Sequence, residues 1–256
     1  VGMDFFDDIL TATYLKKASL SLLLDSLPQS VPPTYTSGKE MLAAALTGRI
    51  RTDASMLRQG AKNATEGANI ATLIATSTST VRDNLNQMLT LAQEVKADPT
   101  KGSVNGAAFT ALAGELSSVA SGTKYNNISL LDKTGWTNDS RLTISGDGKS
   151  STFKLQMGYG SSTFTLNDLS YLNYLKSVDL SSGSLDIDAL ISDLSTQINT
   201  VDVIYSRNNS LSGSYTSEAN VLVEQADILK KAAEDAMPSE EDPLLRDIGS
   251  IISTTS

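Results

Sequence analysis

The feature that most constrains this chain is a helical pattern that continues from about Lys39 to about Ala97. A helix of that length would be roughly 85 Å long at the usual rise per residue. A compact globular core built from 256 residues cannot enclose such a helix. We therefore expect it to lie along partner helices in an elongated body. Its candidate apolar seam consists of Leu57, Ala61, Ala64, Ala68, Ala71, Ala75, Thr78, Arg82, Leu85, Met88, Leu91 and Val95.

The most regular pattern of the chain runs from Leu185 to about Met237, where apolar residues recur at alternating steps of four and three. A seven-residue repeat of this kind predicts the seam of a coiled coil. Asn208 and Ser212 interrupt the seam, and polar residues at such positions lower stability but can fix the register. The residues expected to pack across the seam include Ile191, Leu194, Ile198, Val201, Leu222 and Leu229.

Shorter segments complete the predicted topology. Residues 4–27 predict an amphipathic helix, and residues 28–37 a linker, because three prolines end the helical pattern there. A turn at residues 98–102 predicts that a second helix, from about Asn105 to Ala120, returns along the first. Between residues 140 and 167 apolar and polar residues alternate between glycine-containing turns, which predicts a small β meander.

The expected fold class is therefore mainly α: an elongated antiparallel coiled-coil or helical-bundle rod with a small β-hairpin or β-meander insertion. The expected organisation has five parts. They are an N-terminal amphipathic segment with a Pro-rich linker (1–33), N-terminal rod helices (34–132), a small β insertion (133–175), a C-terminal rod helix (176–237) and an acidic turn with a C-terminal tail (238–256).

Composition argues against several classes of function. The net charge is −9, and no cluster of Lys and Arg offsets it, so binding to nucleic acid or to an anionic membrane is not expected. The run LSLLLDSL is too short to span a bilayer. The chain has no histidine and no cysteine, and thus lacks the commonest general base, the commonest metal ligand and any thiolate nucleophile. We expect no enzyme activity, no cofactor and no metal site.

Three polar clusters are candidate sites of chemistry. The segment 146–150, GDGKS, shares its end with a phosphate-binding loop but lacks the first glycine of that motif, so a hairpin turn is expected. The acidic segment 240–242, with Asp235 upstream, lacks the spacing of a calcium loop and is expected to be a solvated turn. Asp186 and Asp188 lie near the start of a helix, where its dipole favours negative charge.

Two short motifs carry a family resemblance. The first motif, residues 58–67, reads RQGAKNATEG, and the second motif, residues 121–132, reads SGTKYNNISLLD. Together with the helix that contains the first, they resemble the rod domain of bacterial flagellin. The matching residues are Arg49, Leu57, Gln59, Ala61, Asn63, Ala64, Glu66 and Gly67, then Thr123, Tyr125, Asn126, Leu130, Leu131 and Asp132.

The resemblance implies a structural subunit that self-assembles through long helices into a flagellar filament and serves motility. It also implies export through the flagellar type III route, an extracellular location, and partnership with an export chaperone and with cap or junction proteins. Only about 40 residues lie between Lys133 and Leu175, which is too few for the outer domains of larger flagellins.

Two alternatives stay open. The first is a non-polymerising flagellin homologue that acts as a cell-surface binding or adhesion protein or as a hook-filament junction protein. It is motivated by the segments DFFDDIL and STTS, which differ from the usual flagellin ends. The second is a cytoplasmic helical protein with another activity, which the lack of His and Cys disfavours.

Gly60 and Gly67 lie inside the first long helical pattern, where each would weaken an exposed helix by about 1 kcal/mol. Two interpretations remain open for them. They are either a tolerated cost, or the points at which a neighbouring backbone approaches the helix closely.

Overall fold

The structure, a computed structural model, describes residues 34–137 and 139–235, with side chains from Ala45 onward. It is mainly helical and contains a small antiparallel sheet region. The chain divides into two compact units, one comprising Val1–Ala54 and Asp227–Ser256 and the other Ser55–Ala226. The predicted helix at 4–27 and the predicted acidic turn and tail at 238–256 lie outside the described residues.

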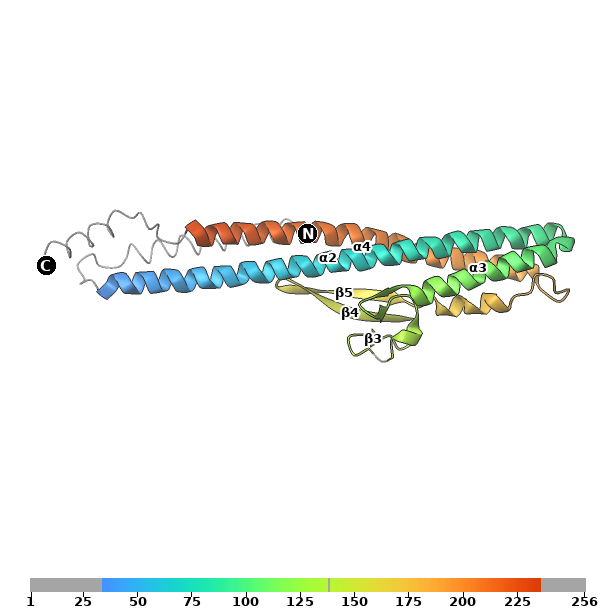
Figure 1. Ribbon diagram of the computed structural model, residues 1–256, viewed down its shortest axis with the longest axis horizontal. Coiled ribbons are helices and arrows are strands. Elements are labelled where there is room, and N and C mark those ends of the chain that lie inside the picture. The colour runs from blue at the N-terminus through green and yellow to red at the C-terminus, as the bar shows by residue number, and fades with distance from the viewer. Residues whose placement is uncertain (1–33, 138, 236–256) are drawn as a thin grey trace. The chain divides into compact units, whose positions relative to one another are not determined.

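Three long helices dominate the described residues: α2 (Thr34–Ala97), α3 (Gly102–Gly122) and α4 (Ile187–Asp235) (Figure 1). The predicted end of α2 at Ala97 is confirmed, but its start is not. Residues 34–37 belong to the helix and not to a linker. The first N–H groups of a helix need no intrahelical acceptor, so a helix can begin directly after prolines.

The connection between α2 and α3 is tighter than expected. A 3₁₀ helix, η1 (Pro99–Lys101), follows Asp98, whose Oδ1 accepts hydrogen bonds from Thr100 N at 3.1 Å and Thr100 Oγ1 at 2.6 Å. This turn leads directly into α3, which therefore begins at Gly102 and not at Asn105. At the start of α4, Asp186 Oδ1 accepts from Ala189 N at 3.0 Å, as expected of an N-terminal cap.

Within Ser55–Ala226, α2 and α4 run antiparallel without a slip in register. Lys96 pairs with Asp188 at 2.5 Å, and Arg82 pairs with Asp202 at 2.9 Å. The hydroxyls of Thr72 and Ser212 lie 2.7 Å apart. Each step back along α2, of fourteen and then ten residues, is matched by an equal step forward along α4.

The returning helix α3 also lies antiparallel to α2 (Figure 1). Asn105 Nδ2 donates to Leu91 O at 3.2 Å and to Glu94 Oε2 at 3.1 Å. Nearer the end of α3, Asn84 Nδ2 donates to Glu115 Oε2 at 3.2 Å. Polar contacts thus fix the register of this pair, while Phe109 and Leu116 are buried.

The predicted β meander is confirmed. Strands β3 (Thr143–Ile144), β4 (Ser150–Met157) and β5 (Gly160–Asn167) form an antiparallel sheet in that order. Phe153 pairs with Phe164 across β4 and β5, with ring centroids 5.2 Å apart, and Phe164 stacks on Tyr215 of α4 at 6.0 Å. This aromatic stack attaches the sheet to α4.

Four short elements were not predicted: strands β1 (Lys124–Tyr125) and β2 (Ile128–Ser129), and the 3₁₀ helices η2 (Lys133–Gly135) and η3 (Ser170–Ser177). Strands β1 and β2 form a hairpin whose two turn residues, Asn126 and Asn127, have φ of 47° and 64°. Positive φ at both residues is typical of a type I′ turn, and asparagine tolerates it better than most residues.

The predicted seam of α4 is on the protected side of the helix, since none of its residues is exposed. Leu194, Val201 and Leu222 are buried, whereas Ile191, Ile198 and Leu229 are half-buried. The protected stripe of α2 is wider than its predicted seam. It also includes Ile70, Ile74 and Val81, because α2 contacts both α3 and α4.

Candidate functional site

The first motif is the surface of α2 on which the turn between β4 and β5 rests. A Cβ atom built on Gly60 would lie 2.1 Å from the backbone N of Gly158 and 2.8 Å from its Cα. No side chain fits in that space, and the obstacle is backbone, which cannot rotate aside. Of the two interpretations of Gly60, the close approach of a neighbouring backbone is confirmed.

Gly67 lies two turns further along α2 and meets side chains. A Cβ there would lie 2.9 Å from Leu155 Cδ1 and 3.2 Å from Tyr215 Cδ2. Of the two interpretations of Gly67, the close approach of a neighbouring backbone is therefore wrong. Its missing side chain leaves room for one residue of β4 and one of α4, and flexible side chains tolerate crowding better than backbone does.

A side-chain amide joins the same surface to the sheet. Asn63 Nδ2 donates to the backbone O of Gln156 at 2.6 Å, while its Oδ1 accepts from Gln59 Nε2 at 3.1 Å. Leu57 packs beneath the turn, with its Cδ2 3.2 Å from an ideal Cβ position on Gly158. Gly158 has φ of +56°, a conformation that favours glycine.

Three of the predicted motif residues of α2 thus contact the β4–β5 hairpin: Leu57, Asn63 and Gly67. Gln59 acts through Asn63, to whose Oδ1 it donates. Ala61 and Ala64 are buried on the same helix, whereas Glu66 is exposed. Arg49 belongs to the unit Val1–Ala54 with Asp227–Ser256 and is exposed.

The second motif holds the opposite end of the same hairpin. Leu130 and Leu131 are fully buried, and Leu169 N, just after β5, donates to Leu131 O at 2.8 Å. Thr123 Oγ1 donates to Ser77 Oγ of α2 at 2.9 Å, and Leu130 N donates to Thr123 O at 3.0 Å. The motif therefore anchors the open end of the sheet to the helices.

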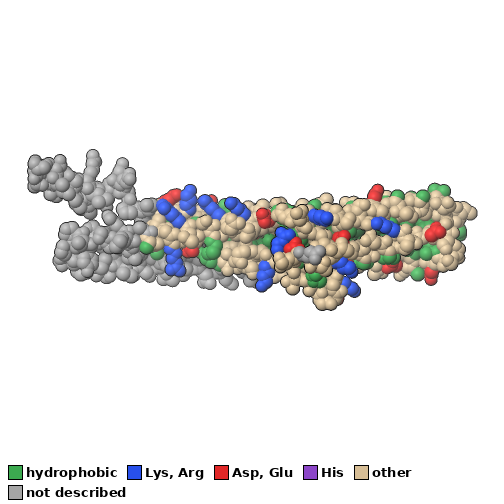
Figure 2. All heavy atoms as spheres, turned by 60° about the horizontal axis from the view of Figure 1, so that its bottom comes forward, with side chains coloured by type: hydrophobic (Ala, Val, Ile, Leu, Met, Phe, Trp, Pro, Cys, Tyr) green, Lys and Arg blue, Asp and Glu red, His purple; other side chains and the backbone are tan. Residues whose placement is uncertain are grey.

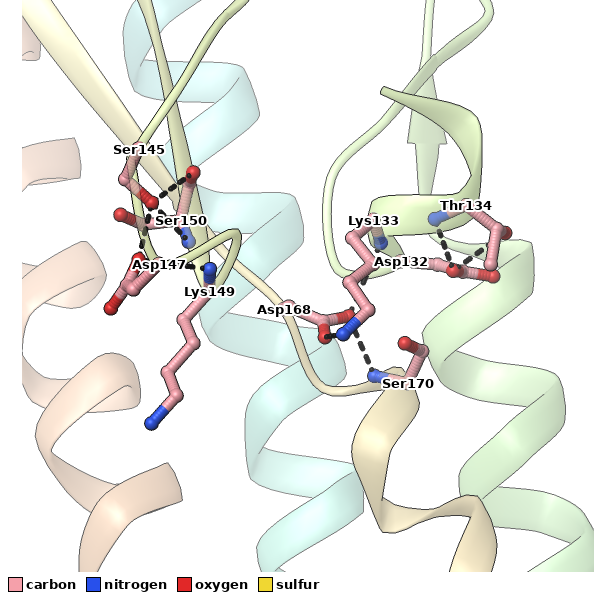
Figure 3. Close-up of polar contacts among 9 residues, drawn as sticks. All are labelled: Asp132, Lys133, Thr134, Ser145, Asp147, Lys149, Ser150, Asp168 and Ser170. Carbon is pink, nitrogen blue, oxygen red and sulfur yellow. Dashed lines mark hydrogen bonds and ion pairs between the residues drawn. The ribbon is translucent and has the colours of Figure 1, made fainter. Parts of the chain in front are cut away.

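The remaining predicted residues of the second motif shape its turns. Tyr125 pairs with Ile128 across the β1–β2 hairpin, with Asn126 in the turn. Asp132 Oδ1 accepts from Thr134 N at 2.9 Å and from Thr134 Oγ1 at 2.7 Å, which starts η2 (Figure 3). These residues have structural partners in the fold.

Sequence reasoning missed Asp168, which joins the end of β5 to the second motif. Its side chain is only 3% exposed, and Oδ1 accepts from Ser170 N at 2.9 Å and from Lys133 N at 3.2 Å. Lys133 Nζ lies 3.3 Å from Oδ2 (Figure 3). The contact between Asp168 and Ser170, two residues on, is a turn pattern that the sequence contains.

Two tyrosines of η3 bind to α4. Tyr171 OH donates to Gln197 Oε1 at 2.8 Å, and Tyr174 OH donates to Asp193. Burial raises the pKa of Tyr171 to about 12. Burial, followed by the hydrogen bond to Asp193, also raises the pKa of Tyr174. Both phenols are therefore neutral at physiological pH and serve as hydrogen-bond donors.

The segment 146–150 is a hairpin turn, as expected. Asp147 Oδ1 accepts from Ser145 Oγ at 2.6 Å and from Lys149 N at 3.0 Å, and Gly148 has φ of +65° (Figure 3). Among the described residues no group of three or more acidic, His or Cys side chains could hold a metal ion. The acidic segment 240–242 lies outside the described residues.

No helix in the described part of the chain is both long enough and apolar enough to cross a membrane. On the face drawn in Figure 2, several of the described Lys and Arg side chains gather near the atoms drawn in grey, and the others lie singly among uncharged and acidic ones.

Comparison with known proteins adds no assignment: no protein-family model matches this chain, and no curated protein matches it either.

Proposed function

We propose that this protein is a structural subunit of a bacterial flagellar-type filament. The observation that carries the proposal is that the two motifs with flagellin resemblance act on the same hairpin. The first motif, through Gly60 and Asn63, holds the turn of β4–β5. The second, through Leu131, holds its open end. Two motifs separated by more than fifty residues thus hold the two ends of one hairpin. This shared role supports the proposal that both belong to one rod architecture.

The proposed rod is an antiparallel coiled coil of α2 and α4, with α3 and the sheet packed against it. Supporting this are the equal steps between paired residues of α2 and α4 and the protected seven-residue seam. Stability of such a body grows with the length of the buried stripe. Long helices also leave extended outer surfaces on which further copies can pack.

The proposal includes the other properties implied by the resemblance. The subunit leaves the cell through the flagellar type III route and assembles outside it with copies of itself, assisted by an export chaperone and by cap or junction proteins. It is not an enzyme and needs no cofactor. Motility is the process that it serves.

Expression in a motile bacterium from which the flagellin genes have been deleted tests this function. We expect the chain in the sheared extracellular fraction and restored swimming. As a matched control, Leu194→Asp, which places a charge at a fully buried seam position, should be lost from that fraction. Export without filaments would favour the non-polymerising homologue, and retention inside the cell would contradict the proposal.

A further inference from the structure

A cavity of about 490 Å³ lies where the open end of the sheet faces α4. Lys149 lines it from the turn before β4 and Asn167 from β5. Lys133 and Tyr171 line it from η2 and η3, and Ile204 from α4. Its volume is within the range of pockets that hold small organic molecules. None of its lining residues belongs to the first motif (58–67) or to the second motif (121–132).

Of the two lysines that line the cavity, only one has a close carboxylate partner. Lys133 Nζ pairs with the buried carboxylate of Asp168 at 3.3 Å. Lys149, by contrast, has no carboxylate of the described residues within ion-pair distance of its Nζ. The neighbouring Asp147 is engaged by the Ser145 hydroxyl and by the backbone N–H of Lys149. The cavity therefore presents one ammonium group without a close ion pair, whose charge the Asp147 carboxylate offsets only at longer range. Figure 3 shows the Lys149 side chain extending away from the turn.

One neutral donor lies beside that charge. Asn167 pairs with Ser150, the residue after Lys149, and within the described part of the chain its side-chain amide has no hydrogen-bond partner. Gln197, also in the cavity wall, is already engaged. Its Oε1 accepts from Tyr171 OH at 2.8 Å, and its Nε2 donates to Asp193 at 2.9 Å.

The rest of the wall is largely apolar. Leu169 and Ile204 are buried residues that line the cavity, together with Tyr171, whose hydroxyl is held by Gln197. A multiply charged anion without an apolar part would find one free ammonium group and would leave these walls without contacts. A single carboxylate attached to an apolar body matches both parts.

We propose that this cavity binds a small organic carboxylate with an apolar body. The carboxylate accepts hydrogen bonds from Lys149 Nζ and Asn167 Nδ2, and the body packs against Leu169, Ile204 and Tyr171. The charge-assisted bond orients the ligand, while burial of the apolar body supplies most of the affinity. The site does not depend on filament formation.

Titration of the ¹⁵N-labelled protein with 2-naphthoate, followed by NMR, tests this proposal. We expect saturable shifts at the amides of residues 149, 167–171 and 200–204. Lys149→Met should weaken binding at least tenfold. The matched control is Lys154→Met, an exposed lysine on β4, the strand that follows the turn holding Lys149, which should leave the affinity unchanged.

Two further ligands separate the contribution of the carboxylate charge to the affinity from that of the apolar body. The neutral analogue 2-naphthamide should bind at least tenfold more weakly than 2-naphthoate, because it lacks the charge. Glucuronate, a carboxylate without an apolar body, should also bind more weakly. Absence of saturable shifts at these amides, equal weakening by both lysine variants, or tighter binding of glucuronate would overturn the proposal.

Discussion

The backbone of Gly158, at the tip of the β4–β5 hairpin, rests directly on Gly60 of α2. An ideal Cβ on Gly60 would lie 2.1 Å from Gly158 N. The contact explains why a residue that weakens helices occurs within a long helix. A loss of helix propensity of about 1 kcal/mol is offset by a close helix–sheet contact that no other residue allows.

Replacement of Gly60 by alanine should therefore destabilise the protein, although alanine favours a helix more than glycine does. Gly60→Ala should lower the free energy of unfolding by about 1–3 kcal/mol, because the hairpin must move. Gly114→Ala is the matched control, since it also lies within a helix but a Cβ there meets nothing within 4 Å. That control should raise stability by about 0.5–1 kcal/mol. Denaturant unfolding measures both, and a stabilising Gly60→Ala would show that the contact is not tight.

The ion pair between Arg82 and Asp202 is expected to fix the register of α2 against α4. Arg82 also lies over the ring of Tyr205, 4.7 Å from its centroid, and its hydrogen bond to Asp202 raises its pKa. Both side chains are partly exposed, so the coupling should be modest, about 0.5–1 kcal/mol. A double-mutant cycle with Arg82→Met and Asp202→Asn measures it. Additive effects would mean that the pair does not contribute to the register.

The loss of stability caused by an aspartate on α4 should increase with the burial of the residue that it replaces. Leu194 has no exposed surface, so Leu194→Asp places an unpaired charge in the core and should abolish cooperative folding of this unit. Ile198→Asp, at a half-buried position, should destabilise less. Val203→Asp is the control on the same helix, because Val203 is 68% exposed. Helical circular dichroism during thermal melting compares the three, and equal melting of Leu194→Asp and Val203→Asp would refute the packed seam.

Between pH 2 and 8, the pH dependence of stability should be confined to the acid end of the range. Without histidine, no side chain has an ordinary pKa between 5 and 8, so stability should be nearly constant there. Hydrogen bonding to Arg141 lowers the pKa of Asp139 from 3.8 to about 2. This depressed pKa contributes stability above about pH 4, and the contribution is lost as the pH falls toward 2. Asp139→Asn should reduce the acid dependence, as measured by unfolding between pH 2 and 7.

Much of the fold could be predicted because its sequence patterns repeat over many residues. The repeat from Ile187 onward and the alternation at Phe153, Leu155 and Met157 each extend over several residues, so the pattern alone indicates helix or strand. The β1–β2 hairpin was missed because its strands have only two residues each, too few to alternate. Its signal was the Asn126–Asn127 pair.

The candidate site was harder to predict than the fold. The motif residues were identified by resemblance, but their roles depend on partners far away in the chain. Asn63 bonds Gln156, ninety-three residues later, and Asp168 bonds Lys133, thirty-five residues earlier. No periodicity encodes such contacts. The two readings of Gly60 could be separated only once the position of Gly158 was known.

Electron microscopy of the purified protein tests the central claim most directly. The account predicts that concentrated subunits polymerise into long filaments of uniform diameter, and that Leu194→Asp does not polymerise. Val203→Ala changes an exposed position of the same helix and should leave the subunit folded. Any change in its polymerisation therefore reports on that surface and not on folding. Single particles of folded protein under all polymerising conditions would contradict the account.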